Sequence, residues 1–117
     1  MPLNINKITE NYCTTAQISA DDIAEVAALG FKTIINNRPD HEGGAEQPTS
    51  ATIKQHAEQL GIQYHHIPVI PNQIQAQQID AFTQAFATAP KPILAFCRTG
   101  NRAARMLELA QAKQANQ

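Results

Sequence analysis

Apolar residues along the chain recur in two alternating periods, one typical of helices and one typical of strands. Near the N-terminal end, Ile23 and Val26 are spaced as on one face of a helix. Ser19 is suited to cap the start of that helix, and Gly30 is suited to end it. The next segment, "FKTIINN" at 31–37, is instead rich in β-forming residues. The pattern therefore predicts a helix and then a strand, which "RPDHEGG" terminates.

The same alternation continues to the end of the chain. In a later predicted helix, Ile79, Phe82 and Phe86 share one apolar face. The run "ILAFC" is apolar throughout, as in a parallel strand that is buried on both faces. The remaining predicted elements are an edge strand or hairpin at 7–17, a helix from Thr49 or Ser50 to Leu60, a strand at 62–69, a helix at about 75–87, a strand at 93–97, and a helix that starts near Arg102.

Strands that alternate with helices indicate an α/β fold, with a mostly parallel central sheet flanked by helices. A chain of 117 residues is expected to form one domain and can bury a substantial core. We therefore predict a single domain over residues 1–117, with its core at about 8–112.

Three loops of such a sheet are expected to meet at one edge. Ligands of parallel sheets bind beyond the carboxyl ends of the strands. Cys97 follows one predicted strand, Arg38 and Asp40 follow another, and Asn72 follows a third. The carboxyl edge of the sheet is therefore the predicted site.

The stretch "AFCRTGNRAARM" at 95–106 places a thiol between a buried strand and the start of a helix. The backbone N–H groups of such a loop, together with the positive end of the helix, form a nest for an anion. Gly100 allows the backbone to curl, and Arg102 can grip two oxygens of a tetrahedral anion. The other loop residues expected to contact the anion are Arg98, Thr99 and Asn101.

A thiol in this position is expected to have a lowered pKa, which would make Cys97 a thiolate and a nucleophile toward phosphorus or sulfur. The alternative is that Cys97 is a small buried apolar residue that ends a strand. The presence of Gly100, Arg102 and a helix start in register favours the activated thiolate.

Composition and charge argue against several other functions. The chain is 43% hydrophobic and 16% charged, and its net charge of −1 gives no reason to expect a nucleic-acid or membrane partner. The first residues lack the basic and apolar regions of a signal peptide, so a cytoplasmic location with free thiols is expected. The histidines and cysteines lack zinc-site spacing, and neither a metal nor a cofactor is predicted.

The loop "FCRTGNRAA" resembles the signature loop of cysteine-dependent phosphatases and of rhodanese-like sulfurtransferases. "GFKTIINNRPD" and "YHHIPV" resemble segments of dual-specificity phosphatases. From about Ile18 to Ala110, the chain is similar to the DUF442 family, also called the beta-lactamase hydrolase-like phosphatase family. The resemblance implies a compact dual-specificity-phosphatase-like α/β domain in which Cys97 is the nucleophile and Arg102 binds the anion.

Two features depart from the pattern of protein tyrosine phosphatases. Those enzymes place five residues between the cysteine and the arginine, whereas four separate Cys97 from Arg102, which is the rhodanese length. They also carry an aspartate general acid in the loop that corresponds to "IPNQIQAQQ", where the first following carboxylate is Asp80. We read Asp80 as a solvent-facing helix residue, which leaves Asp40 as the candidate for the general acid.

The function that the sequence favours is a cysteine-dependent, phosphatase-like hydrolase. Its partner would be a phosphate ester or another small tetrahedral anion, or a phosphoprotein. One alternative is a rhodanese-like sulfurtransferase that forms a persulfide on Cys97. Another is a non-catalytic module that binds phosphate or sulfate.

Several side chains near the predicted site have a plainer interpretation beside the functional one. Arg38 is either a contact for the substrate or a surface residue at a strand end, and Asp40 is either an acid or an ordinary turn residue. One of His65 and His66 should face inward, as a hydrogen-bonded histidine rather than a base. Cys13 is read as a buried spectator, with a redox link to Cys97 left open.

Overall fold

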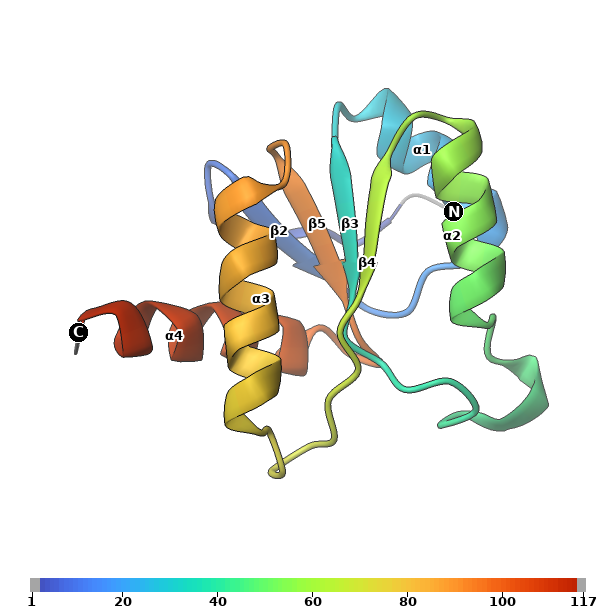
Figure 1. Cartoon of the computed structure of the whole chain (residues 1–117). Coiled ribbons are helices and arrows are strands. Elements are labelled where there is room, and N and C mark those ends of the chain that lie inside the picture. Colours follow the sequence, from blue (N-terminus) through green and yellow to red (C-terminus); the bar gives the residue numbers. More distant parts are fainter. Residues whose placement is uncertain (1–2, 116–117) are drawn as a thin grey trace.

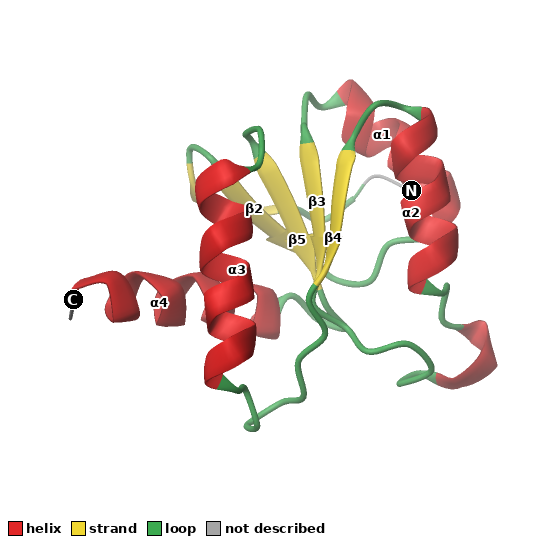
Figure 2. Ribbon diagram, viewed as in Figure 1, coloured by secondary structure: helices red, strands yellow, loops and turns green. Residues whose placement is uncertain are grey.

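A five-stranded sheet forms the centre of the protein in the computed structural model, which describes residues 3–115 (Figure 1, Figure 2). The strand order is β1-β2-β5-β3-β4, and only the β1–β2 pair is antiparallel among the described strands. The predicted mostly parallel α/β fold is confirmed, and the segment at 7–17 forms a hairpin. The strands are β1 (Asn6–Thr9), β2 (Tyr12–Thr15), β3 (Thr33–Asn36), β4 (Gln63–His66) and β5 (Ile93–Phe96).

Helices cover both faces of this sheet. Two of them lie on one face and two on the other, as Figure 1 shows. Each begins close to its predicted start. The first pair is α1 (Ile23–Ala28) and α2 (Ser50–Gln59), the second is α3 (Ala76–Thr88) and α4 (Asn101–Ala115), and short 3-10 turns lie at Ala20–Asp22 and Gly44–Glu46.

Local sequence explains where the helices on the first face begin and end. The carboxylate of Asp22 accepts a hydrogen bond from the backbone N–H of Ser19 at 2.8 Å, at the turn that leads into α1. The Thr49 hydroxyl accepts one from the N–H of Thr52 at 3.3 Å at the start of α2. After α1 the chain reverses at Gly30, whose φ of +93° favours glycine.

Alternate residues of the central strands fill two separate cores. Ile35 and Ala95 pack into the core beneath α3 and α4, together with Phe82 of α3. Ile34 and Leu94 point the opposite way, into the core beneath α1 and α2. This alternation follows from the period of two in a strand, and it buries β3 and β5 completely.

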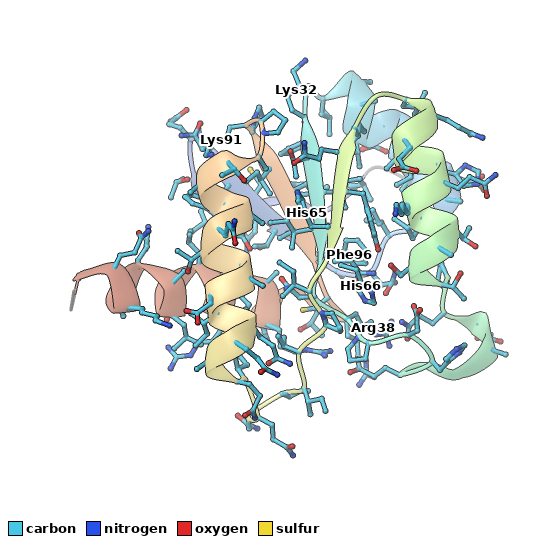
Figure 3. The ribbon with its side chains drawn as sticks, viewed as in Figure 1. Lys32, Arg38, His65, His66, Lys91 and Phe96 are labelled. Carbon is cyan, nitrogen blue, oxygen red and sulfur yellow. The ribbon has the colours of Figure 1, made fainter. Side chains whose placement is uncertain are left out.

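The loops that leave β3, β4 and β5 all emerge at the same edge of the sheet, because these strands run parallel (Figure 1). Arg38 and His66 lie close together at this edge (Figure 3), where His66 Nε2 is 2.9 Å from the backbone carbonyl oxygen of Arg38. The fold therefore brings the three predicted loops together.

Candidate active site

Cys97 stands directly after β5, and its side chain is completely buried. The backbone N–H of Gly100 donates a hydrogen bond to the sulfur of Cys97 at 3.1 Å. Gly100 has φ of +98°, and a Cβ atom there would lie 3.4 Å from the backbone oxygen of Thr15. The loop therefore curls around the sulfur in a way that favours glycine at position 100.

The first turn of α4 follows this loop immediately, so its N-terminal end lies beside Cys97. Tyr12 of β2 fixes that turn, because its hydroxyl donates a buried hydrogen bond of 2.6 Å to the backbone carbonyl of Ala103. Burial raises the pKa of Tyr12 far above its ordinary value, and Cys97 raises it further. Tyr12 therefore remains a protonated donor and ties α4 to the sheet.

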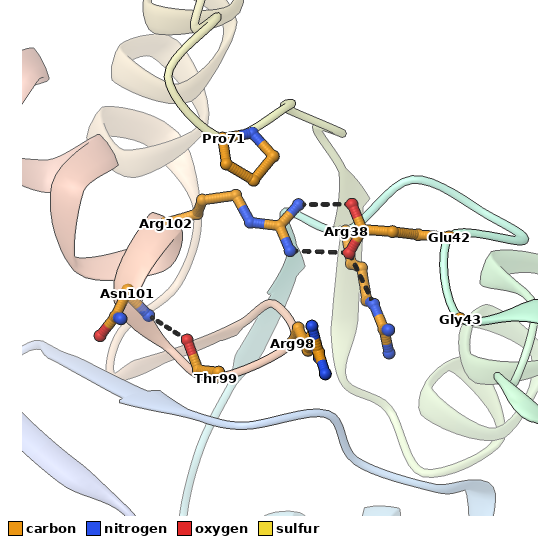
Figure 4. A pocket seen from close by; sticks show the side chains of 8 residues that line it. All are labelled: Arg38, Glu42, Gly43, Pro71, Arg98, Thr99, Asn101 and Arg102. Atoms are coloured by element: carbon orange, nitrogen blue, oxygen red, sulfur yellow. Dashed lines mark hydrogen bonds and ion pairs between the residues drawn. The ribbon is translucent and has the colours of Figure 1, made fainter.

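A pocket of about 800 Å³ opens at this edge (Figure 4). Its walls come from all three loops that the sequence predicted to meet. They are Arg38, Glu42 and Gly43 after β3, Pro71 after β4, and Arg98, Thr99, Asn101 and Arg102 after β5.

Glu42, which was not predicted as a site residue, holds Arg102 in place. Its carboxylate accepts hydrogen bonds from Nη1 and Nη2 of Arg102 at 2.8 and 2.7 Å, and from Nε of Arg38 at 2.9 Å (Figure 4). The side chains of Arg102 and Arg38 are only 10% and 9% exposed, and that of Glu42 is 26% exposed. The available signal was a second carboxylate in "RPDHEGG", two residues after Asp40.

These contacts keep Glu42 ionised. Hydrogen bonds from Arg102 hold the pKa of Glu42 below its ordinary value of 4.5, in opposition to desolvation, and Arg38 lowers it further. The hydrogen bonds with Glu42 raise the pKa of Arg102, and the neighbouring Cys97 raises it further. Glu42 is therefore an acceptor for both guanidinium groups rather than a proton donor.

The five N–H donors of Arg102 divide between the protein and the pocket. Nη1 uses both of its donors, one on Glu42 and one on the carbonyl of Val69 at 2.9 Å, and Nη2 uses one on Glu42. One N–H of Nη2 and the N–H of Nε remain, and they lie along the same edge of the planar group. Two parallel N–H groups are the arrangement that grips two oxygens of a tetrahedral anion.

Arg38 lies two residues after β3 and supports this arrangement through Glu42. It is 7% exposed, so the alternative of a surface residue is wrong. Besides Glu42, it reaches the side-chain oxygen of Gln17 with Nη1 at 3.1 Å. A Cβ atom on Gly43 would lie 2.7 Å from its Nη2 atom, so a glycine beside it gives Arg38 the room that it occupies.

Asp40 does not line the pocket. One of its carboxylate oxygens accepts a hydrogen bond of 2.8 Å from the backbone N–H of Ser50, at the start of α2. Its role as general acid stays a prediction that no contact supports. Asp80, which we expected to face solvent, pairs with Lys113 and has a side chain that is 59% exposed.

His66 and Cys13, the other residues considered from the sequence, make contacts that hold the fold together. His66 is bonded to backbone, as expected of a hydrogen-bonded histidine. Cys13 lies buried in β2, and burial raises the pKa of its thiol. Both cysteines are free thiols. Within residues 3–115, no group of three or more His, Cys, Asp or Glu side chains is placed to hold a metal ion, and no helix in that range combines the length and apolarity of a membrane span.

Comparison with known sequences identifies relatives of nearly the whole chain. The family model described as "Beta-lactamase hydrolase-like protein, phosphatase-like domain" matches residues 4–114. The Beta-lactamase hydrolase-like protein of Agrobacterium fabrum is 37% identical over 106 residues, which cover 91% of this chain and 24% of that protein. The protein of the same name from Xylella fastidiosa is 32% identical over 109 residues, which cover 93% of this chain and 25% of that protein. The chain thus spans about a quarter of the length of these relatives.

Solved structures support the fold. A phosphatase candidate from Neisseria meningitidis is 40% identical, with a TM-score of 0.84 over 94% of this chain and 78% of that one. TpbA of P. aeruginosa, crystallised in complex with phosphotyrosine, is 15% identical, with a TM-score of 0.61 over 85% of this chain and 56% of that one. At that identity the second likeness shows the fold alone. The predicted cysteine-phosphatase-like fold is confirmed.

Proposed function

Because the chain belongs to the family of the beta-lactamase hydrolase-like protein, phosphatase-like domain, we propose that it is a cysteine-dependent hydrolase of phosphate esters. One observation carries this proposal. The sulfur of Cys97 accepts the N–H of Gly100, directly before a helix whose Arg102 keeps two parallel N–H groups that neither Glu42 nor Val69 uses.

In the first step, the Cys97 thiolate attacks phosphorus and a phosphocysteine forms as the bond to the leaving oxygen breaks. The free edge of Arg102 and the loop N–H groups of Arg98, Thr99 and Arg102 hold the remaining phosphoryl oxygens, while the N–H of Gly100 stays on the sulfur and that of Asn101 stays on the Thr99 hydroxyl. Because these donors are fixed before the substrate arrives, they can stabilise the charge that develops in the transition state. In the second step, water attacks phosphorus, and the electron pair of the S–P bond returns to Cys97.

Trapping of the intermediate tests this proposal. Wild-type protein is offered 4-nitrophenyl phosphate, quenched with acid, and analysed by mass spectrometry for phosphate on Cys97. Cys13→Ser is the matched control, because Cys13 is also a buried free thiol. We expect turnover and the adduct to survive in Cys13→Ser and to disappear in Cys97→Ser. Turnover that persists in Cys97→Ser would refute the proposal.

A sulfurtransferase is the second candidate, favoured by the four residues between Cys97 and Arg102. In that reaction the thiolate would take the outer sulfur of thiosulfate and release sulfite, leaving a persulfide on Cys97. Mass spectrometry after treatment with thiosulfate distinguishes the two chemistries by the group found on Cys97. Retention of sulfate by a protein that forms neither adduct would favour the non-catalytic module.

A further inference from the structure

Every carboxylate side chain of the protein can be accounted for, because all ten Asp and Glu residues lie within the described range. Glu42 is the one among them that lines the 800 Å³ pocket. It accepts three hydrogen bonds from two nearly buried arginines, so protonation of Glu42 would break a site that the anion itself requires. A proton for the leaving group therefore has no carboxylic source at the pocket.

The histidines do not fill this role either. None of the four lines the pocket. His66 Nε2 is engaged with the carbonyl of Arg38, and His65 Nε2 with the side-chain oxygen of Gln63 at 2.8 Å. The pocket thus offers fixed positive charge to the substrate rather than a carboxylic or imidazole proton donor.

A second hollow of about 450 Å³ continues the first one along α4. The two share Pro71, Asn101 and Arg102 as walls. The further walls of the second hollow are Asn72, Ile74, Arg105 and Leu109. It therefore combines apolar side chains with a further guanidinium, next to the residue that would hold the phosphoryl group.

Arg105 is available to a ligand in this hollow. It stands three residues after Arg102, which places both on neighbouring positions of one helix face. Its side chain is 57% exposed and pairs with Glu108, which is 65% exposed, at 3.0 Å. An exposed pair of this kind contributes little stability and is easily exchanged for another anion.

From this arrangement we propose that the leaving group occupies the second hollow and departs without a proton, as an anion that Arg105 stabilises. The inference rests on the proposed function and names its substrate class. The substrates are phosphate esters and anhydrides whose leaving oxygen is a stable anion, namely aryl phosphates, acyl phosphates and phosphoric anhydrides. Alkyl phosphates, whose alkoxide is a poor leaving group, are excluded.

The step balances without an acid. The Cys97 thiolate supplies the electron pair of the new S–P bond, and the pair of the breaking P–O bond leaves on the oxygen of the departing anion. Water then attacks the phosphocysteine, inorganic phosphate is released, and the proton lost by water passes to the solvent. Cys97 ends the cycle as a thiolate.

Phenyl phosphate and benzyl phosphate test the substrate class, because they carry the same ring on an aryl and an alkyl oxygen. A general acid is typically worth about 10²–10⁴-fold in rate, and an enzyme with one can accept both. Without one, we expect kcat/KM for benzyl phosphate to be lower than for phenyl phosphate by about 10²-fold or more, and that for 4-nitrophenyl phosphate to exceed both. Values for the benzyl and phenyl esters within about tenfold would overturn the inference, as would a selective loss of benzyl ester turnover in Asp40→Asn.

The Arg105→Gln variant tests the second hollow. Lys54→Gln on α2 removes the same charge from a distant surface and serves as control. We expect kcat/KM for 4-nitrophenyl phosphate to fall about threefold in Arg105→Gln, which matches the loss of one partly solvated ion contact, and to stay unchanged in Lys54→Gln. Equal values for the two variants would overturn the placement.

The two proposals fail in different ways. If phosphocysteine forms equally well from phenyl and benzyl phosphate, the substrate class is wrong and the phosphatase chemistry stands. If no donor leaves phosphate on Cys97, both are wrong.

Discussion

Replacement of Glu42 by glutamine removes the charge that holds Arg102 while keeping the size of the side chain. Three hydrogen bonds join Glu42 to Arg102 and Arg38. A hydrogen bond to a charged group contributes about 1.5–3 kcal/mol when it is buried. Because the Glu42 side chain is 26% exposed and solvent screens its charge, we expect the whole set to contribute less than three such bonds together, about 1–3 kcal/mol.

The loss should appear in kcat, because the free edge of Arg102 is no longer held in one direction. A misplacement of about 1 Å can cost about 10²-fold in rate, and 1–3 kcal/mol corresponds to about 5–150-fold. We therefore expect kcat for 4-nitrophenyl phosphate to fall by about 10–10²-fold in Glu42→Gln.

Affinity for a product anion should respond differently. Removal of the Glu42 charge relieves repulsion of the bound anion by about 0.7–2.8 kcal/mol, for unit charges about 6 Å apart at effective dielectric constants of about 80 to 20. This gain offsets the loss of orientation, so the Ki of inorganic phosphate should change by less than about threefold.

Steady-state kinetics with phosphate as inhibitor measures both quantities. Glu46→Gln, in the exposed 3-10 turn of the same loop, is the matched control and should leave both unchanged. If kcat is retained in Glu42→Gln and Ki falls tenfold or more, Glu42 instead occupies the anion site and competes with the substrate. That result would refute the role of Glu42 in orienting Arg102.

Three further outcomes are expected. Gly100→Ala should slow alkylation of Cys97 by iodoacetamide, since the N–H that faces the sulfur must move. The control is Gly30→Ala, because Gly30 has a similar φ and open space around it; this variant should destabilise the fold without changing the alkylation rate. Equal alkylation rates in the two variants would contradict the role of the loop. Tyr12→Phe should lower the free energy of unfolding by about 1–2 kcal/mol, measured in urea, because it deletes a buried hydrogen bond; an unchanged midpoint would show that the bond contributes nothing net. Since the folded-state pKa of Glu42 lies below 4.5, its pairing stabilises the fold above that value and is lost as the pH falls through the folded-state value. The difference in urea midpoint between wild type and Glu42→Gln should therefore shrink from pH 7 to pH 3, and a constant difference would argue against the pairing.

The fold could be predicted from sequence largely because its strands and helices follow different periods. Ser19, Thr49 and Gly30 mark ends of elements by local chemistry that does not depend on the rest of the fold. The order of strands in the sheet was not predicted, since β5 lies between β2 and β3 through contacts that no local pattern encodes.

The edge of the sheet and the three loops that meet there could be predicted, but the contacts between loops could not. Cys97, Gly100 and Arg102 occur within six residues, so their spacing alone predicts that they lie together. Glu42 is separated from Arg102 by 60 positions, and only the parallel packing of β3 beside β5 brings the two together. Asp40 was the carboxylate that the sequence suggested as the general acid, yet it accepts a hydrogen bond from the N–H of Ser50.

The bridge between Arg102 and Glu42 has a consequence for protein engineering. The hexapeptide "CRTGNR" looks like a portable cassette, since it contains both the sulfur and the guanidinium. Grafted onto another parallel sheet, it would bring an arginine whose guanidinium is not held in one direction. The carboxylate that orients Arg102 is Glu42, which belongs to a different loop and is itself bonded to Arg38. A successful transplant would have to move two segments, 38–43 and 97–102, with the spacing between their strands intact.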